Sequence, residues 1–442
     1  MNRRRVEAFS ETMHRLYHDG DFSPIHVGGN HCMNVTLQVT EFCNMACSYC
    51  YQHDKTNRRM SFETAKKFID LLLAADDRTA GYLNSRTNAG VVIDFIGGEP
   101  LLEIDLISDI SDYFIAETMR LGHPWATRYR FSICTNGLLY FDPKVQEYLK
   151  RHQNHVSLSV TIDGDKKLHD SCRFDLAGNG TYDRAVAAAL DYQKRFDKNT
   201  GTKVTVSPDN VGFVYQAIKN LVEIGYDDIN MNCVFERGWT YYHGSVLYGQ
   251  LKKIADYLIE NDLDEKVHIS MLDNPAGEPL PETHNQNWCG GVGLMMCCDP
   301  QGDIYPCLRY APSSIGGNQP LYKIGDVEHG LMKTEEELQR VKCLSCITRR
   351  SQSTDECFNC PVATGCGGCS AYNYEVNGTP DMRTTFICAM HKARSLGIVY
   401  YRNRAFKKNG STERFPMHLP REEALRIISE EEYELLLKEV ET

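Results

Sequence analysis

The sequence contains no long run of apolar residues. No segment approaches the roughly eighteen needed for a transmembrane helix, and the basic start MNRRRVEAFSETMHRLY lacks the apolar stretch of a signal peptide. Internal repeats and low-complexity tracts are also missing. Basic residues are in deficit, because 48 Lys and Arg against 59 Asp and Glu give a formal net charge of -11. We therefore expect a cytoplasmic protein that binds neither membranes nor nucleic acids.

Cysteine, by contrast, is unusually abundant. The chain has 18 cysteines, and a cytosolic protein is kept reduced, so this number indicates metal binding and not disulfides. Eleven of them, from Cys289 to Cys388, fall in the last third of the chain and predict a separate cysteine-rich module there. The remaining composition, with 42% hydrophobic and 24% charged residues, is typical of a globular protein.

Residues 33–235 alternate β-branched runs with helical patterns, which predicts parallel strands joined by right-handed crossovers. The six strand candidates begin at Met33, Val91, Arg128, His155, Thr202 and Asp228. Among the helices, one has a plausible N-cap at Ser61 and another ends at Gly225. Six such units fit either a partial (β/α)6 barrel or an open doubly wound sheet, and in both the functional loops follow the strands.

Four loops after these strands are predicted to converge on one face. They are EFCNMACSYCY (Glu41–Tyr51), GGEP (Gly97–Pro100), CTNG (Cys134–Gly137) and the pair Asp163–Gly164. The first carries three cysteines without a fourth. Three thiolates can hold three irons of a four-iron cluster and leave the last iron open to a small chelating ligand, whereas structural zinc sites take four protein ligands. Zinc or a redox pair is the alternative interpretation.

These loops resemble the signature of the radical S-adenosylmethionine (radical SAM) enzymes. Cys43, Cys47, Tyr49 and Cys50 match C-x-x-x-C-x-aromatic-C, and GGEP follows the second strand as it does in that superfamily. The resemblance implies an α/β fold with a partial (β/α)6 TIM-like barrel. It also implies that S-adenosylmethionine chelates the open iron of a 4Fe-4S cluster and is cleaved to a 5'-deoxyadenosyl radical.

The same resemblance implies a set of cofactor contacts. Tyr49 would lie against the adenine, the GGEP backbone would meet the methionine amine, and Thr161 and Arg173 would lie near the ribose and the carboxylate. The expected cofactor-binding residues are therefore Tyr49, Gly97, Gly98, Glu99, Pro100, Thr161 and Arg173. GGEP as a simple turn and Arg173 as a surface ion pair are the plainer alternatives.

The C-terminal cysteines resemble the SPASM domain, which binds two auxiliary 4Fe-4S clusters. By that resemblance the outer cluster would be ligated by Cys357, Cys360, Cys366 and Cys388. The inner cluster would be ligated by Cys289, Cys307 and Cys369, with Cys297 or Cys298 as the fourth ligand or with an open site. Only two residues separate Cys366 from Cys369, where the family usually has three. The spacing of Cys343 and Cys346 from Cys357 and Cys360 also fits a zinc ribbon, so a structural zinc site formed by these four cysteines is the rival interpretation.

The predicted domains follow from these motifs. They are an N-terminal helical extension (1–32), the radical SAM barrel (33–245), a helix and linker (246–287), the SPASM domain with its iron-sulfur sites (288–395) and a C-terminal helical extension (396–442). Only about thirty residues precede the first strand, so we expect the barrel, the C-terminal helix or a separate peptide-recognition protein to capture the substrate.

The resemblance implies a ribosomally synthesised precursor peptide as substrate and flavodoxin or ferredoxin as reductant. Our leading hypothesis is a ranthipeptide-like maturase that forms thioether links. Formylglycine formation of the anaerobic sulfatase-maturase type, carbon-carbon cross-linking and peptide epimerisation are the enzymatic alternatives. A non-enzymatic iron-sulfur or zinc-binding interaction protein is the alternative from another class. The sequence marks no catalytic base.

Overall fold

The computed structural model describes residues 33–52, 55–74, 82, 90–196, 202–287, 289, 291 and 295–441. The helical extension predicted for residues 1–32 lies outside them. Six strands carry the N-terminal half: β1 (Met33–Thr40), β2 (Val91–Gly97), β3 (Tyr129–Thr135), β4 (Val156–Val160), β5 (Thr202–Val206) and β6 (Asp228–Cys233). All adjacent pairs within β1–β4 are parallel, as is the pair β5 and β6. The predicted α/β class with parallel strands is confirmed.

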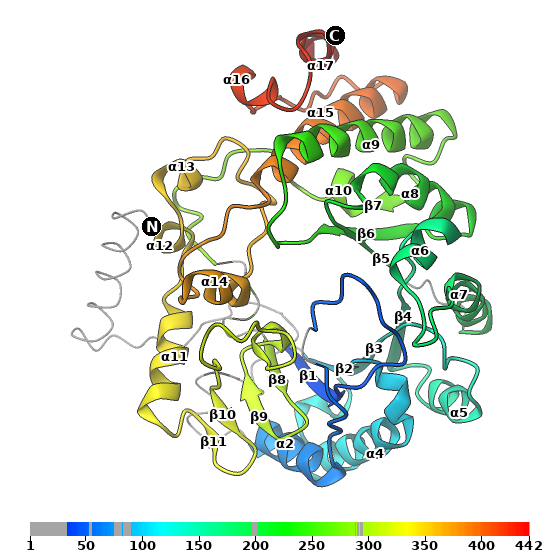
Figure 1. The fold of residues 1–442 in the computed structure, drawn as a ribbon, viewed down its shortest axis with the longest axis vertical. Helices are drawn as coiled ribbons and strands as arrows, with labels where there is room; N and C mark the ends of the chain where they lie inside the picture. Colours follow the sequence, from blue (N-terminus) through cyan, green and yellow to red (C-terminus); the bar gives the residue numbers. More distant parts are fainter. Residues whose placement is uncertain are drawn as a thin grey trace.

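The strands follow an arc and form two hydrogen-bonded sheets (Figure 1). One sheet contains β1 to β4, and the other contains β5, β6 and the short β7 (His268–Ile269). Helices cover the convex side of the arc: α2 (Phe62–Ala74), α4 (Ile104–Arg120), α5 (Pro143–Arg151), α7 (Tyr182–Phe196) and α8 (Val214–Glu223). The loop after β1 lies inside the arc.

Local chemistry explains where several of these helices begin and end. The Ser61 hydroxyl accepts a hydrogen bond from the Thr64 amide at 3.0 Å, which caps α2 as predicted. Gly225, which follows α8, has a φ of +100°, a conformation that favours glycine. On β2, Val91, Ile93 and Phe95 are buried at alternate positions, so one face of the strand packs into the core.

The C-terminal cysteine-rich region joins the barrel through a strand. β8 (Met295–Cys298) pairs in parallel with β1, with Asn34 opposite Met295 and Leu37 opposite Cys298. The antiparallel strands β9 (Asp303–Tyr305), β10 (Gly325–Asp326) and β11 (Gly330–Leu331) extend the same sheet outward. The helices of this region are α11 (Glu335–Ser345), α12 (Arg349–Gln352), α13 (Asp355–Phe358) and α14 (Ser370–Asn377). They lie on the opposite side of the molecule from α5 and α7 (Figure 1).

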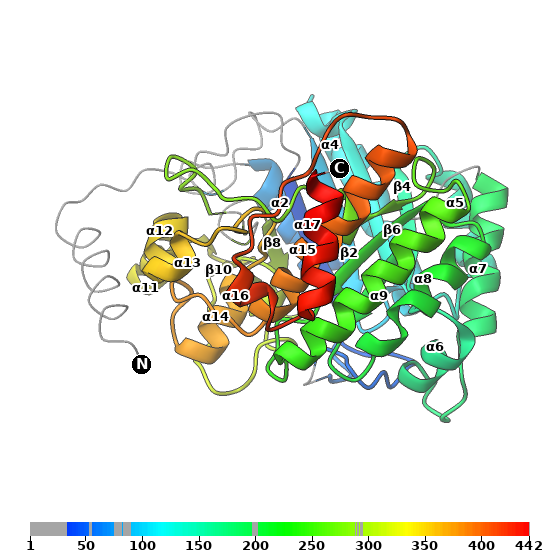
Figure 2. The same cartoon turned by 90° about the horizontal axis from the view of Figure 1, so that it is seen from above.

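Two long helices, α9 (Tyr241–Glu260) and α15 (Cys388–Lys408), pack along each other beside β6 (Figure 2). A Cβ at Gly397 would lie 2.9 Å from the Leu251 side chain, so glycine permits this close approach. The domain boundaries predicted at residues 245 and 395 fall inside these two helices. No helix in the described part of the chain has the length and apolar character of a membrane span.

Short elements complete the chain: η1 (Pro100–Glu103), η2 (Pro124–Ala126), α6 (Lys166–Cys172), η3 (Val211–Phe213), α10 (Ser270–Asp273) and η4 (Leu308–Tyr310). The helical segment predicted near the C-terminus consists of two helices, α16 (Arg421–Ala424) and α17 (Glu430–Glu441). The Ser429 hydroxyl accepts a hydrogen bond from the Glu432 amide at 3.2 Å, which starts α17 as a separate helix.

Candidate functional site

The three-cysteine loop is held at the C-terminal ends of the strands by backbone hydrogen bonds. The amides of Gly98 and Glu99 donate to the carbonyls of Thr40 and Phe42, each at 3.0 Å. A Cβ at Gly97 would lie 2.3 Å from the Thr40 carbonyl oxygen. GGEP therefore supports the cysteine loop directly, and two of its amides are used in doing so.

Glu99 connects GGEP to the loop after β3. Its buried carboxylate accepts hydrogen bonds from the Thr135 hydroxyl at 2.6 Å and from the Asn136 and Leu101 amides at 2.9 and 3.1 Å. Burial raises the pKa of Glu99 above its ordinary value, although these hydrogen bonds act in the opposite direction. The Asn136 side chain in turn donates to the Asn44 side chain at 2.7 Å. Loops from three strands are thus fixed to one another.

Arg173 lies beside the cysteine loop in a buried ion pair. Its Nε is 2.7 Å from Oδ2 of Asp163, the Tyr49 hydroxyl donates to that same oxygen, and Arg173 Nη1 is 3.9 Å from the Cys47 sulfur. The other Asp163 oxygen is buried without a hydrogen-bond partner among the described residues. The Thr161 hydroxyl lies 3.7 Å from the Cys134 sulfur. Sequence reasoning placed Asp163 in a convergent loop but missed its pairing with Arg173.

Buried thiols and a lysine set the electrostatics of the loop. Burial raises the pKa of Cys43 to about 11 and also raises the pKa of Cys47. For Lys55, burial lowers the pKa, but hydrogen bonding and charge interaction with Cys50 and its neighbours outweigh that effect and raise it. Metal ligation requires thiolates, so a metal cluster bound here would displace the protons of these thiols. Sequence reasoning missed Lys55, whose only signal is its position five residues after Cys50.

The C-terminal cysteines fall into two groups. In the inner group, a Cβ at Gly291 would lie 3.4 Å from the Cys307 sulfur and 3.6 Å from the Cys289 sulfur, and Cys369 interacts electrostatically with both. The outer group consists of Cys357, Cys360, Cys366 and Cys388, which interact electrostatically with one another.

Arg383 contacts the outer group directly. Its Nη2 donates to the Cys366 sulfur at 3.1 Å and to the Cys366 carbonyl at 3.0 Å. A cation thus lies among the four thiols, and sequence reasoning gave no indication of it. This arrangement resembles the hydrogen bonding that tunes metal-bound sulfur in proteins.

The other candidate cysteines occupy different surroundings. Cys297 and Cys298 are buried in β8, and Cys297 interacts electrostatically with Cys307. Cys343 lies beside Tyr322 and Asp381 at the end of α11. The zinc-ribbon interpretation needs Cys343 and Cys346 together with Cys357 and Cys360, whereas the structure groups the latter two with Cys366 and Cys388. Across the described residues, no three His, Cys, Asp or Glu side chains form a single-ion metal site.

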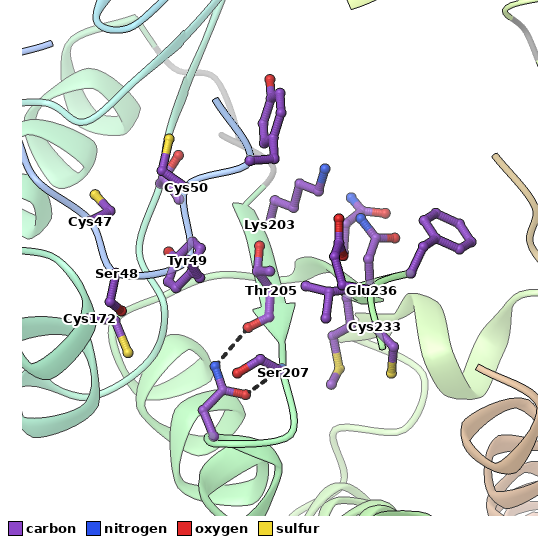
Figure 3. A pocket seen from close by; sticks show the side chains of 18 of the residues that line it. Cys47, Ser48, Tyr49, Cys50, Cys172, Lys203, Thr205, Ser207, Cys233 and Glu236 are labelled. Carbon is purple, nitrogen blue, oxygen red and sulfur yellow. Dashed lines mark hydrogen bonds between the residues drawn. The ribbon is translucent and has the colours of Figure 1, made fainter. Parts of the chain in front are cut away.

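One cavity of about 1510 Å³ reaches from the cysteine loop to the inner cysteine group. Its lining includes Cys43, Cys47 and Cys50, with Gly97, Gly98, Glu99, Thr161 and Arg173 close to them, and also Cys369 of the inner group. Figure 3 shows the cysteine loop facing β5 and Glu236 across this space. Pockets for single small ligands usually measure about 300–1,000 Å³, so a cofactor and part of a second molecule can fit together.

Residues 37–212 match the Radical SAM superfamily. An uncharacterized protein of Methanocaldococcus jannaschii is 28% identical over 205 residues, which cover 45% of this chain and 62% of that protein. A serine-type anaerobic sulfatase-maturating enzyme of Bacteroides thetaiotaomicron is 24% identical over 363 residues, 75% of this chain and 80% of the relative. The radical SAM cyclopropyl synthase TigE of Paramaledivibacter caminithermalis is 22% identical over 360 residues, 77% and 68% of the two chains.

Two solved structures share the fold. Native anSMEcpe, with bound AdoMet and the Kp18Cys peptide, has a TM-score of 0.60 at 17% identity and covers 85% of this chain and 99% of its own. Streptococcus suis SuiB, bound to the precursor peptide SuiA, has a TM-score of 0.54 at 14% identity, with 87% and 79% covered. The likeness extends well beyond the barrel into the cysteine-rich region.

Proposed function

Since residues 37–212 form a radical SAM domain in a chain related to sulfatase-maturating enzymes, we propose that this protein is a peptide maturase that installs thioether links. The observation that carries the proposal is the single cavity that joins Cys43, Cys47 and Cys50 to Cys369 of the inner cysteine group. A peptide bound there would reach both the site of hydrogen abstraction and a second site able to hold its own thiolate. Both solved neighbours are described with a bound peptide, which supports a peptide substrate.

The residues of the cysteine loop fit a 4Fe-4S cluster with S-adenosylmethionine. Three thiols from one loop offer cluster ligands, and the nearby cations Lys55 and Arg173 offer polar contacts for a cofactor. When bound, these groups would supply the 5'-deoxyadenosyl radical that takes hydrogen from carbon. The chain's own residues would position them. GGEP holds the loop, and Arg173, oriented by Asp163 and with Nη1 beside the Cys47 sulfur, lines the cavity where its guanidinium can meet a carboxylate.

We assign the auxiliary sites by the same reasoning. Cys357, Cys360, Cys366 and Cys388 would hold the outer cluster, and Cys289, Cys307 and Cys369 the inner one. Cys297 would be the fourth inner ligand, or that position would be open to the substrate thiolate. Each thioether removes two hydrogens from the peptide: one atom goes to the 5'-deoxyadenosyl group, and one proton and one electron leave separately. The electron must pass to an iron-sulfur acceptor and then to a protein such as flavodoxin or ferredoxin.

The direct test uses the anaerobically reconstituted protein with S-adenosylmethionine, a reductant and the co-expressed precursor peptide. We expect 5'-deoxyadenosine, and a product that has lost two hydrogens and one alkylatable thiol for each link. Carbon-carbon cross-links would remove two hydrogens but leave every thiol, and epimerisation would leave the mass unchanged. If 5'-deoxyadenosine does not exceed that of the Cys43→Ala, Cys47→Ala, Cys50→Ala variant, the protein is not a radical enzyme.

Formylglycine formation is the second candidate, and the long alignment with the sulfatase-maturating relative favours it. When a peptide cysteine is oxidised, it would replace the sulfur by oxygen and also remove two hydrogens, so the same mass spectrum distinguishes it. The Glu236 carboxylate lines the cavity and forms an ion pair with Arg309 at 3.1 Å. An iron and zinc count tests the auxiliary sites, because zinc near one per chain would contradict them. The cytoplasmic location remains a prediction from the sequence.

A further inference from the structure

Four polar side chains of β5 and β6 face the large cavity. Lys203 and Thr205 lie on β5, Asn230 and Asn232 lie on β6, and all four line the cavity. Figure 3 shows Lys203 and Thr205 between the cysteine loop on one side and Glu236 on the other. These side chains are not part of the cofactor site described above.

The strand register makes these residues one surface. Lys203 is opposite Asn230 and Thr205 is opposite Asn232 in the parallel pairing. Because side chains alternate along a strand, the intervening Val204 points to the other face, where it is buried in the core, and Met231 is also buried. Neighbouring strands lie about 4.8 Å apart and alternate residues about 6.6 Å apart. The four groups therefore form a polar patch about the size of one or two residues of an extended peptide.

The four polar groups make no hydrogen bond or ion pair with one another or with other residues that the structure describes. The other cations lining the cavity do have partners. These partners are the Cys50 thiol for Lys55, Asp163 for Arg173, Glu236 for Arg309, the Phe386 ring for Arg237, and backbone carbonyls for Arg394. Lys203 differs from them because its ammonium forms no hydrogen bond or ion pair with any residue that the structure describes, and its printed interaction is an electrostatic one with the Cys134 thiol.

We propose that Lys203, together with Asn230 and Asn232, recognises an aspartate or glutamate side chain of the peptide substrate. An ammonium that lacks an internal partner gains most from a bound carboxylate, and carboxamides supply the donors and acceptors that a peptide backbone needs. The proposal rests on the proposed function, since it assumes that a peptide enters this cavity. It adds that the precursor carries an acidic residue near the position that reacts.

The test is affinity selection by the full, reconstituted protein from a synthetic library of peptides with one central cysteine and random flanks. The peptides are amidated at the C-terminus. We expect enrichment of Asp and Glu at one flanking position, by about tenfold or more for a charged hydrogen bond. Lys203→Met should abolish this enrichment, Lys203→Arg should retain it, and Lys203→Glu should select Lys and Arg instead. Lys194→Met, on the outer helix α7, is the matched control and should select as the wild type does.

Several outcomes overturn the proposal. They are an absence of acidic enrichment by the wild type, equal enrichment by Lys203→Met, and enrichment only when the peptide C-terminus is a free acid, which would show capture of a chain end. A further overturning outcome would come from calorimetry, which measures the affinity for S-adenosylmethionine. If Lys203→Met weakens that affinity and leaves peptide selection intact, the lysine binds the cofactor and not the peptide. Selection does not depend on cross-linking. A peptide preference without thioether products would therefore reject the proposed reaction and keep this recognition site.

Discussion

Gly98→Ala tests whether GGEP holds the cysteine loop in place. A Cβ at this position would lie 2.2 Å from the Phe42 carbonyl oxygen and 2.7 Å from the Cys43 amide nitrogen. Such contacts are essentially never shorter than 3.0 Å, so the backbones must separate by about 0.8 Å. Both contacting atoms belong to the backbone and cannot rotate away. The separation displaces Cys43 and stretches the two 3.0 Å hydrogen bonds from GGEP to Thr40 and Phe42.

We expect this displacement to disturb the proposed 4Fe-4S cluster at Cys43, Cys47 and Cys50 more than it lowers the stability of the fold. Overpacking of this kind costs about 1–3 kcal/mol, whereas a misplacement near 1 Å can lower a rate by about 10²-fold. The measurements are iron and sulfide per chain, the electron paramagnetic resonance signal of the reduced protein with and without S-adenosylmethionine, and the rate of 5'-deoxyadenosine formation.

Gly212→Ala is the matched control for this experiment. A Cβ there meets no atom within 4 Å, so we expect wild-type behaviour. Our reasoning is refuted if Gly98→Ala shows the same iron content, the same cofactor-dependent signal and the same rate as Gly212→Ala.

Three further predictions concern buried charges. Arg173→Met should lower the free energy of unfolding by about 3–5 kcal/mol, because Asp163 is then buried without a countercharge. The double variant Arg173→Met, Asp163→Asn should recover most of that loss. Equal unfolding midpoints for the single and the double variant would contradict this reasoning. Burial lowers the pKa of His169 to about 4. Stability should therefore fall by up to about 3 kcal/mol as the pH drops from 6.5 towards 4, because only the unfolded chain binds the proton, and His169→Gln should flatten that titration. Arg383→Met should lower the reduction potential of the proposed outer cluster by on the order of 60 mV, because a cation at the Cys366 sulfur favours the reduced state. A redox titration measures this shift. An unchanged potential would count against the contact.

Sequence patterns predicted the strands better than the long C-terminal helix. β1 spans Met33–Thr40 as expected, because its apolar residues alternate with polar ones along the segment, which is the pattern of a strand. The predicted C-terminal helical extension begins at residue 396, whereas α15 begins at Cys388, inside the predicted SPASM domain. This helix is buried on several sides, by α9, α10 and α17, so its sequence lacks the polar stripe that marks a surface helix. Tertiary packing, and not local pattern, determines that helix.

The candidate site could be predicted where residues are close in sequence. Cys43, Cys47 and Cys50 lie within one loop, and GGEP is a compact motif, so both were visible in the chain. The pairing of Arg173 with Asp163 and the contact of Arg383 with Cys366 depend on how separate segments fold back on one another. Lys203 was invisible for a different reason, because a lysine in a strand gives no sign of facing an internal cavity.

The parallel pairing of β8 with β1 has a consequence for biosynthesis. The paired residues Asn34 and Met295 are separated by about 260 residues, so a ribosome that adds 5–20 residues per second leaves this edge of β1 open for roughly 13–50 s. During that time the strand carrying the cysteine loop presents unpaired backbone groups, which invite pairing with another chain. Assembly of the proposed cluster at Cys43, Cys47 and Cys50 before β8 emerges would therefore occur on an incomplete sheet with an exposed edge.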